Sequence, residues 1–451
     1  MPKVALIFPY FRTRSLTEML FPPLGLANLT SQLRGLGIDT KIFDCTFETF
    51  RRIRKKLREY GPDIVGIYSM ITMSRNTFRI AQTVREALPD CLLVAGGPLP
   101  TLYPERYAGL FDAVFRGESD LSFPRFCHDY FEQGIERNKP VTGLSKRLEA
   151  LVSPVPEPRT GAGEHNSYEG LYIQKAGLEV NNPTIHYNEE ELGTFPLPDR
   201  RDFDHTTYQK TWLETNGTKT TSIITTLGCP YSCDFCSRPV FGNLFRRRNL
   251  DAVFEEIEQI KQFGYDSLWI ADDTFTLNHA HLEAFCQRIA SRKLSWSCLS
   301  RSNNVNEEMT RMMKEAGCQR VYLGLETGDQ DTLRLMNKRA TVEDGINAVE
   351  KFNKAGIEVA AFFIVGYPGE TIQSIEKTFR LALTLPLDYI SFNVPFPLPG
   401  SNLFERVSEI DTSKDWNTEN EVTFVYHSEF DTAWLRRRIR QTMKAFAEKR
   451  D

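Results

Sequence analysis

The first third of the chain alternates short apolar runs with segments whose apolar positions recur at helical spacing. The runs at 3–10, 63–70 and 91–98 are mostly apolar, and those at 39–45 and 113–118 contain shorter apolar stretches. The segments at 24–37, 49–61 and 77–89 between them are amphipathic. Strands that are apolar throughout are typical of a parallel sheet covered by helices on both faces. We therefore expect residues 1–145 to form a doubly wound α/β domain of the Rossmann-like or flavodoxin-like kind.

A second alternation begins near residue 220 and has a different spacing. Six strand-like runs, each followed by a helical pattern, occur at 221–228, 267–272, 295–300, 320–326, 358–366 and 389–396. Six such units predict a partial (β/α)6 barrel of the TIM type over residues 216–400. Residues 146–215 are rich in proline and glycine and are interpreted as an interdomain linker, and residues 401–451 as a helical extension.

Composition and charge exclude several classes of protein. The 451 residues carry 55 basic and 59 acidic side chains, so the net charge of −4 gives no support for a nucleic-acid partner. No apolar run is long enough for a membrane span, and the first run ends too early, at Pro9, for a secretory signal. Nine cysteines, an odd number and mostly scattered, do not resemble a disulfide framework, so we expect a cytoplasmic protein.

Three cysteines stand apart from the other six. Cys229, Cys233 and Cys236 are spaced C-x3-C-x2-C and directly follow the first barrel strand, at the barrel face where active sites lie. Structural zinc takes four ligands, and neither a second cysteine pair nor a histidine lies nearby. A 4Fe–4S cluster fits better, because three thiolates leave one iron open for another ligand. Phe235 is placed to cover the cluster or to stack on that ligand.

Other candidate residues end the later barrel strands. They are Asp272 and Asp273 after the second strand, Arg301 after the third, Glu326 at the end of the fourth and Gly366 after the fifth. Each has a structural alternative. In these alternatives, one of the aspartates would cap a helix, Arg301 and Glu326 would form salt bridges at the barrel rim, and Gly366 would make a plain turn.

The strand ends of the first domain are also rich in candidate ligand contacts. Paired glycines at a strand end let a ligand approach the backbone closely, although tight turns alone would also explain them. The candidates are Ser69, Met70, Thr72, Gly96, Gly97, Pro98, Thr101, Gly117 and Glu118.

The cysteine motif, with its aromatic residue before the last cysteine, resembles the radical S-adenosylmethionine (SAM) superfamily over about residues 220–400. The upstream segments 22–37, 63–70, 95–101 and 115–119 are similar to the cobalamin-binding domain fused to many such enzymes. The resemblance implies a 4Fe–4S cluster on the three cysteines, SAM on the open iron and cobalamin on the first domain. It further implies that Asp272, Asp273, Glu326 and Gly366 lie near SAM, and that a flavodoxin- or ferredoxin-type donor supplies electrons.

One feature of the first domain departs from the common cobalamin pattern. Many such domains carry Asp-x-His-x-x-Gly, whose histidine binds cobalt, but no histidine here precedes His128. Leu99 also stands where relatives often have histidine. We therefore expect base-off cobalamin without a histidine ligand, with Tyr10, Met70 and Met73 as candidate neighbours of cobalt.

The resemblance implies a C-methyltransferase that moves a methyl group from SAM, by way of methylcobalamin, to an unactivated carbon. A radical enzyme of the same class that oxidises, cyclises or rearranges its substrate is the alternative, and a cobalamin sensor with a structural cluster is a third. The expected substrate is a small molecule or a peptide, and the expected state is a monomer.

Overall fold

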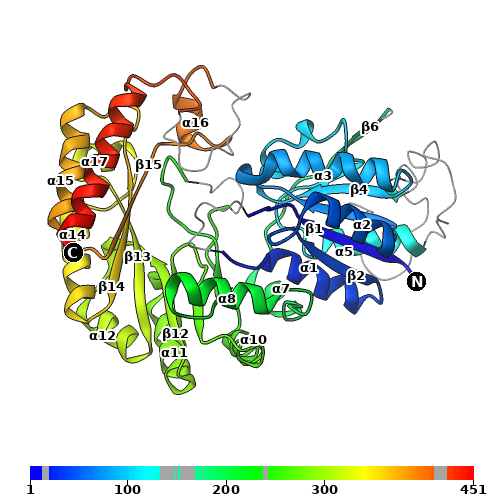
Figure 1. The fold of residues 1–451 in the computed structure, drawn as a ribbon, viewed down its shortest axis with the longest axis horizontal. Coiled ribbons are helices and arrows are strands. Elements are labelled where there is room, and N and C mark those ends of the chain that lie inside the picture. Colours follow the sequence, from blue (N-terminus) through cyan, green and yellow to red (C-terminus); the bar gives the residue numbers. More distant parts are fainter. Residues whose placement is uncertain are drawn as a thin grey trace. The chain divides into compact units, whose positions relative to one another are not determined.

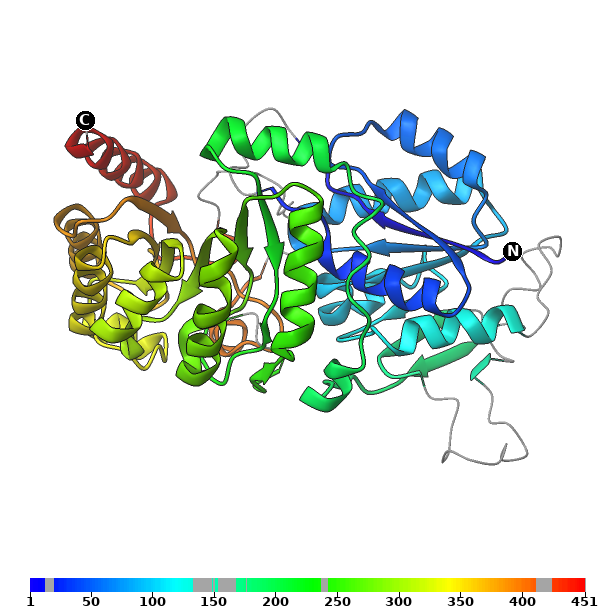
Figure 2. The same cartoon turned by 90° about the horizontal axis from the view of Figure 1, so that it is seen from below.

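The chain divides into two units, Met1–Asn216 and Gly217–Asp451 (Figures 1 and 2). The computed structural model describes residues 1–12, 20–132, 148, 151–152, 168–175, 177–236, 242–410 and 424–450. No helix in these ranges is both long and apolar enough to cross a membrane.

The first unit is built on one seven-stranded sheet with the order β2-β1-β3-β4-β5-β6-β7. Its five parallel strands are β1 (Lys3–Phe8), β2 (Asp39–Asp44), β3 (Ile64–Tyr68), β4 (Leu92–Gly96) and β5 (Ala113–Phe115). The order 2-1-3-4-5 is that of flavodoxin-like folds, so the predicted doubly wound domain is confirmed.

Alternate residues of each parallel strand enter two separate cores. Val4 and Leu6 pack with α1 (Leu24–Gly35) and α5 (Ser122–Glu132), whereas Ala5 and Ile7 pack with α2 (Phe50–Tyr60) and α3 (Ser74–Ala87). Because successive side chains of a strand point to opposite faces, a continuously apolar run is buried on both sides.

The stretch 146–215, interpreted above as a linker, contributes to the first unit wherever the structure describes it. β6 (Leu171–Lys175) pairs antiparallel with β5, and β7 (Leu178–Asn181) pairs with β6. Helix α7 (Glu189–Gly193) and helix α8 (His205–Asn216) follow. In α8, Tyr208 donates a hydrogen bond to Asp44 Oδ2 (2.7 Å), and Trp212 Nε1 donates to the Leu20 carbonyl (2.5 Å).

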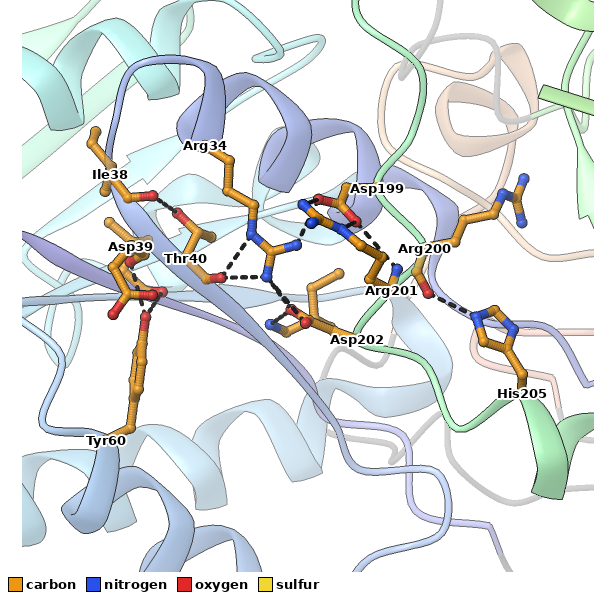
Figure 3. Close-up of polar contacts among 12 residues, drawn as sticks. Arg34, Ile38, Asp39, Thr40, Tyr60, Asp199, Arg200, Arg201, Asp202 and His205 are labelled. Carbon is orange, nitrogen blue, oxygen red and sulfur yellow. Dashed lines mark hydrogen bonds and ion pairs between the residues drawn. The ribbon is translucent and has the colours of Figure 1, made fainter. Parts of the chain in front are cut away.

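The segment before α8 is held against the edge strand β2 by charged groups (Figure 3). Arg34 donates to Asp199 Oδ2 (2.6 Å), to Asp202 Oδ2 (2.9 Å) and to the Thr40 carbonyl. Asp202 also accepts from the Ile42 backbone N–H at 2.8 Å. Two backbone groups of this edge strand, the Thr40 carbonyl and the Ile42 N–H, are thereby occupied.

The second unit is a six-stranded, wholly parallel sheet with the order β15-β14-β13-β12-β11-β8. The strands are β8 (Thr220–Ile223), β11 (Ser267–Ile270), β12 (Ser295–Ser300), β13 (Cys318–Glu326), β14 (Glu358–Ile364) and β15 (Tyr389–Asn393). The intervening helices include α10 (Leu250–Gln262), α11 (His279–Ile289), α12 (Glu307–Glu315), α13 (Gln330–Leu335), α14 (Val342–Lys354) and α15 (Ile372–Thr384). Strands in sequential order that leave β8 and β15 as two edges make the predicted partial barrel.

The predicted C-terminal helix is α17 (Thr432–Arg450), which packs along α15 (Figure 1). Arg438 forms an ion pair with Glu376 of α15 at 2.6 Å. The shorter helix α16 (Asn402–Arg406) lies between β15 and α17 in the sequence and contacts the cysteine loop described below.

Candidate functional site

The three cysteines lie in a loop that follows β8 and the two-residue strand β9 (Thr226–Leu227), at the carboxyl end of the sheet. β9 pairs antiparallel with β10 (Arg246–Arg247), which brings the chain around residue 244 against Gly228. Gly228 has a φ of +77°, and a Cβ there would collide with the Leu244 carbonyl. Glycine is therefore required where the chain turns into the loop.

Several long-range hydrogen bonds fix the cysteine loop. The Asp234 N–H donates to the Met336 carbonyl (3.0 Å), and Asn337 Nδ2 donates to the Ser232 carbonyl (2.8 Å). The Asp234 carboxylate accepts from Asn402 Nδ2 (3.1 Å) and pairs with Arg406 (2.8 Å). Sequence reasoning missed Asp234 and Asn337, because their partners lie more than 100 positions away.

The thiols of the loop fit a cluster. All three are free and half-buried, whereas the other six cysteines are buried in the cores. No group of three or more His, Cys, Asp or Glu side chains in the described ranges converges on a single metal ion. Thiolates that bind different irons of a cubane need not converge on one point, as the ligands of a zinc ion must.

Asp272 positions this loop from within the protein. It is fully buried two residues beyond the end of β11, and both of its carboxylate oxygens accept hydrogen bonds from Thr225 (2.6 Å each). Thr226 donates to Oδ2 at 2.8 Å. Burial raises the pKa of Asp272 to about 6, and these hydrogen bonds oppose that shift. The neighbouring Asp273 is exposed, and its carboxylate accepts from the Gly228 N–H.

Glu326 and Arg301 both lie at the barrel rim and are buried, with 6% exposure each. Glu326 ends β13 with a φ of +63°, where the register with β14 shifts, and it forms an ion pair with Lys338 at 2.5 Å. A non-glycine residue in this region is strained, and such strain is concentrated at functional sites. Arg301 Nη1 donates to Cys233 Sγ at 3.4 Å, and Nη2 donates to the Lys338 carbonyl. Lys338 also lies 6.0 Å from the centre of the Phe235 ring.

Gly366 has a φ of +81°, and a Cβ there would lie 2.7 Å from the Phe424 ring and 3.2 Å from Leu435. Close packing of Phe424 and Leu435 against Gly366 thus explains why this position is a glycine. Glu370, in the same turn, accepts from the Tyr367 N–H at 2.7 Å, and burial raises its pKa to about 7. Its Oε1 has no hydrogen-bond partner among the described residues.

In the first unit, the candidate residues gather at the ends of β3, β4 and β5. Ser69 is fully buried, and its hydroxyl bonds to Tyr107 (2.8 Å) and Thr77 (3.1 Å). Thr101 Oγ1 accepts from the Gly117 N–H (2.8 Å) and donates to the Gly97 carbonyl (2.9 Å). These bonds fix the turns that surround the partly exposed remainder of the set, namely Met70, Thr72, Gly96, Gly97 and Pro98.

Two further features of this edge bear on a ligand. Gly97 has a φ of +106°, and a Cβ there would lie 2.7 Å from the Ser69 carbonyl, so the turn after β4 accepts only glycine. Glu118 is buried and accepts from the Tyr187 N–H and from His186, each at 3.1 Å. The sequence order did not reveal His186 beside β5. Among the candidate neighbours of cobalt, Met73 is only 2% exposed, so its side chain lies in the protein interior.

Comparison with known proteins agrees with both halves of this architecture. Residues 223–382 match the Radical SAM superfamily, and residues 17–126 match the B12 binding domain. The chain belongs to the B12-binding radical SAM enzymes, a family whose members include methyltransferases and cyclases.

Among its relatives is an uncharacterized methyltransferase, PH0819, of Pyrococcus horikoshii. It is 33% identical over 393 residues, which cover 85% of this chain and 78% of that protein. The anaerobic magnesium-protoporphyrin IX monomethyl ester cyclase of Cereibacter sphaeroides is 25% identical, and the match covers 89% of this chain and 63% of the cyclase.

A solved structure shares the fold across both units. The radical SAM methyltransferase TsrM from Kitasatospora setae, with cobalamin and a 4Fe–4S cluster bound, superposes with a TM-score of 0.70 at 19% identity. The superposition covers 91% of this chain and 78% of TsrM.

Proposed function

We propose that this protein is a C-methyltransferase that transfers a methyl group from SAM to an unactivated carbon of a small molecule or a peptide. The observation that carries the proposal is a loop of three free, half-buried cysteines at the carboxyl end of a parallel barrel, in a chain that also has a B12-binding domain. When bound, the cluster and cobalamin supply one-electron and methyl-carrying chemistry that side chains lack.

The residues of this chain bind and orient these groups. Cys229, Cys233 and Cys236 hold the cluster, and Phe235, Asp273 and Glu326 lie around its loop and at neighbouring strand ends as candidate contacts for SAM. In the first domain, the glycines and polar residues after β3, β4 and β5 hold cobalamin. We propose that cobalamin binds here without a histidine ligand, because the described ends of β1, β3 and β4 carry no histidine and His186, beside the end of β5, bonds to Glu118.

We further propose that the enzyme acts as a monomer in the cytoplasm. An external flavodoxin- or ferredoxin-type donor would supply the electron. The nine free cysteines are consistent with a reducing compartment.

The test uses purified protein, reconstituted anaerobically with iron, sulfide and hydroxocobalamin, and given SAM and titanium(III) citrate. We expect both 5′-deoxyadenosine and S-adenosylhomocysteine, and a product heavier by one methyl group when candidate substrates are added. Cys233→Ala should abolish 5′-deoxyadenosine, whereas Cys286→Ala, a change in a core far from the loop in sequence, should retain it. Cleavage that survives Cys233→Ala would overturn the proposal.

A second function is favoured by the relationship to the cyclase. A radical enzyme that oxidises or cyclises its substrate would form 5′-deoxyadenosine without S-adenosylhomocysteine. Under the same conditions, that product pattern decides between the two functions. Absence of both products in a cluster-replete protein would favour a sensor whose cluster is structural.

A further inference from the structure

Arg301 places a buried positive charge against one of the cysteine sulfurs. Its Nη1 donates to Cys233 Sγ at 3.4 Å, and its guanidinium stacks on the Tyr231 ring with 3.7 Å between the guanidinium carbon and the ring centre. Nη2 donates to the Lys338 carbonyl, and Nε has no partner in the described ranges. These contacts hold the guanidinium in one orientation.

No carboxylate of the described residues forms an ion pair with Arg301. The nearby Glu326 is already paired with Lys338, and Asp234 is paired with Arg406. An uncompensated buried charge is strongly unfavourable, so a buried arginine without an acidic partner indicates a negative group that binds beside it. Among the described residues, the group beside Nη1 that becomes negative when it binds a cluster is the sulfur of Cys233.

We propose that Arg301 is a positioning residue that sets the reduction potential of the cluster through its N–H···S bond to Cys233. This inference rests on the proposed function, because it requires a cluster on the three cysteines. The oxidised cluster core carries two positive charges, so with three thiolates the net charge of the cluster is −1. Reduction of the cluster by one electron makes that charge −2 and breaks no bond. A fixed positive charge stabilises the more negative, reduced state and therefore raises the potential.

The reduction potential of the cluster affects two electron transfers in opposite ways, from the external donor to the cluster and from the cluster to SAM. A higher potential makes the cluster easier to reduce by its external donor and a weaker reductant toward SAM. The strength of this effect depends on low exposure, because water would screen the charge, and Arg301 is only 6% exposed.

A different role for Arg301 would be to bind the carboxylate of SAM. The two roles can be distinguished in SAM-free protein, because there Arg301 can act only on the cluster. The experiment therefore measures the midpoint potential of the cluster in SAM-free protein, by titration with titanium(III) citrate monitored through the EPR signal of the reduced cluster.

Arg301→Gln removes the charge and retains an N–H donor, and Arg301→Lys retains the charge. We expect Arg301→Gln to lower the equilibrium constant for reduction at least tenfold, which is about 59 mV for a one-electron couple, and Arg301→Lys to stay closer to the wild type. The matched control is Arg320→Gln, which removes a charge at the opposite end of the barrel strands, where Arg320 pairs with Glu358. The control should leave the potential unchanged.

An Arg301→Gln protein with full iron content and an unchanged potential would overturn the inference, above all if its affinity for SAM fell. If Arg301→Gln fails to assemble a cluster, Tyr231→Leu decides, because it removes the ring that holds the guanidinium against the sulfur. A smaller drop in potential is then expected, and no drop would count against the inference. Wild-type protein that takes up no cluster would instead refute the proposed function.

Discussion

The carboxylate of Asp272 accepts two hydrogen bonds of 2.6 Å from one residue, the backbone N–H and the hydroxyl of Thr225. Asp272 lies two residues beyond the end of β11, and Thr225 stands four positions before Cys229. A strand end of the barrel is thus joined to the segment that leads into the cysteine loop. The carboxylate acts on the site by holding the backbone rather than by facing a ligand.

Replacing Asp272 with asparagine should change how stability depends on pH. Burial raises the pKa of Asp272 to about 6, above the ordinary carboxyl value of about 3.9 in an unfolded chain. The folded state therefore holds this proton more tightly, and the contribution of Asp272 to the free energy of unfolding falls as the pH rises from about 4 to about 6. Urea titrations should show that the difference in free energy, wild type minus Asp272→Asn, falls by about 2 kcal/mol across this window. Parallel pH profiles would contradict the assignment.

Gly228→Ala should prevent the cysteine loop from forming. The new methyl group would collide with the Leu244 carbonyl, in backbone that already has a φ of +77°. We expect iron content after reconstitution to fall to less than half of the wild-type value. Gly217→Ala is the control, because Gly217 has a φ of +71° with nothing within 4 Å of a Cβ, so it carries the strain without the collision. That change should cost about 1 kcal/mol and leave iron binding intact. Equal iron loss in the two variants would show that backbone strain alone is responsible.

Arg34→Met should destabilise the first unit. The change removes hydrogen bonds to Asp199 and Asp202 (Figure 3), in a site where the two carboxylates are only 10% and 16% exposed. We expect a loss of about 2–3 kcal/mol in the free energy of unfolding at pH 7. Lys55→Met, at an exposed pair with Glu59, should change it by less than about 0.5 kcal/mol.

The loss in Arg34→Met should shrink in acid. Burial alone would raise the pKa of Asp199, but hydrogen bonds from Arg201 and Arg34 outweigh it and hold that pKa well below its usual range. A carboxyl with a lowered folded pKa stabilises the protein above its unfolded pKa of about 3.9, and this contribution is lost as the pH falls below it. Denaturation at a series of pH values measures this, and a loss that stayed constant from pH 7 to pH 3 would contradict the role of the pair.

Tyr208→Phe should loosen α8 from the strand ends of the first unit. The buried hydroxyl donates to Asp44 Oδ2 at 2.7 Å and lies 3.0 Å from Thr46 Oγ1. Removing it leaves the half-buried Asp44 carboxylate, whose pKa is already raised by burial, with one donor fewer, at a cost of about 1–3 kcal/mol. Tyr172→Phe, which loses an exposed bond to Gln174, is the control and should be nearly neutral in thermal denaturation. Equal effects would indicate that the hydroxyl of Tyr208 does not anchor α8.

The amino-acid sequence by itself determined the two α/β units and the cysteine loop after the first barrel strand. These features are local, because an apolar run that is buried on both faces and three thiols within eight positions are each encoded in a few consecutive residues. The positions of the strands follow for the same reason, since each run alternates between two cores, as Val4 and Ala5 do. Their ends do not, because the run expected at 389–396 stops as a strand at Asn393.

Only the tertiary structure decided what the charged residues of the site contact. Arg301 donates a hydrogen bond to Cys233, which is 68 positions away, and Glu326 forms an ion pair with Lys338. Glu118 accepts a hydrogen bond from His186, which lies in a stretch that resembled a linker. Asp272 and Asp273 are adjacent in sequence, yet one is fully buried against Thr225 and the other is exposed. Such differences depend on which strand ends the parallel sheet brings together and how deeply each side chain is buried, and no local pattern of residues encodes either.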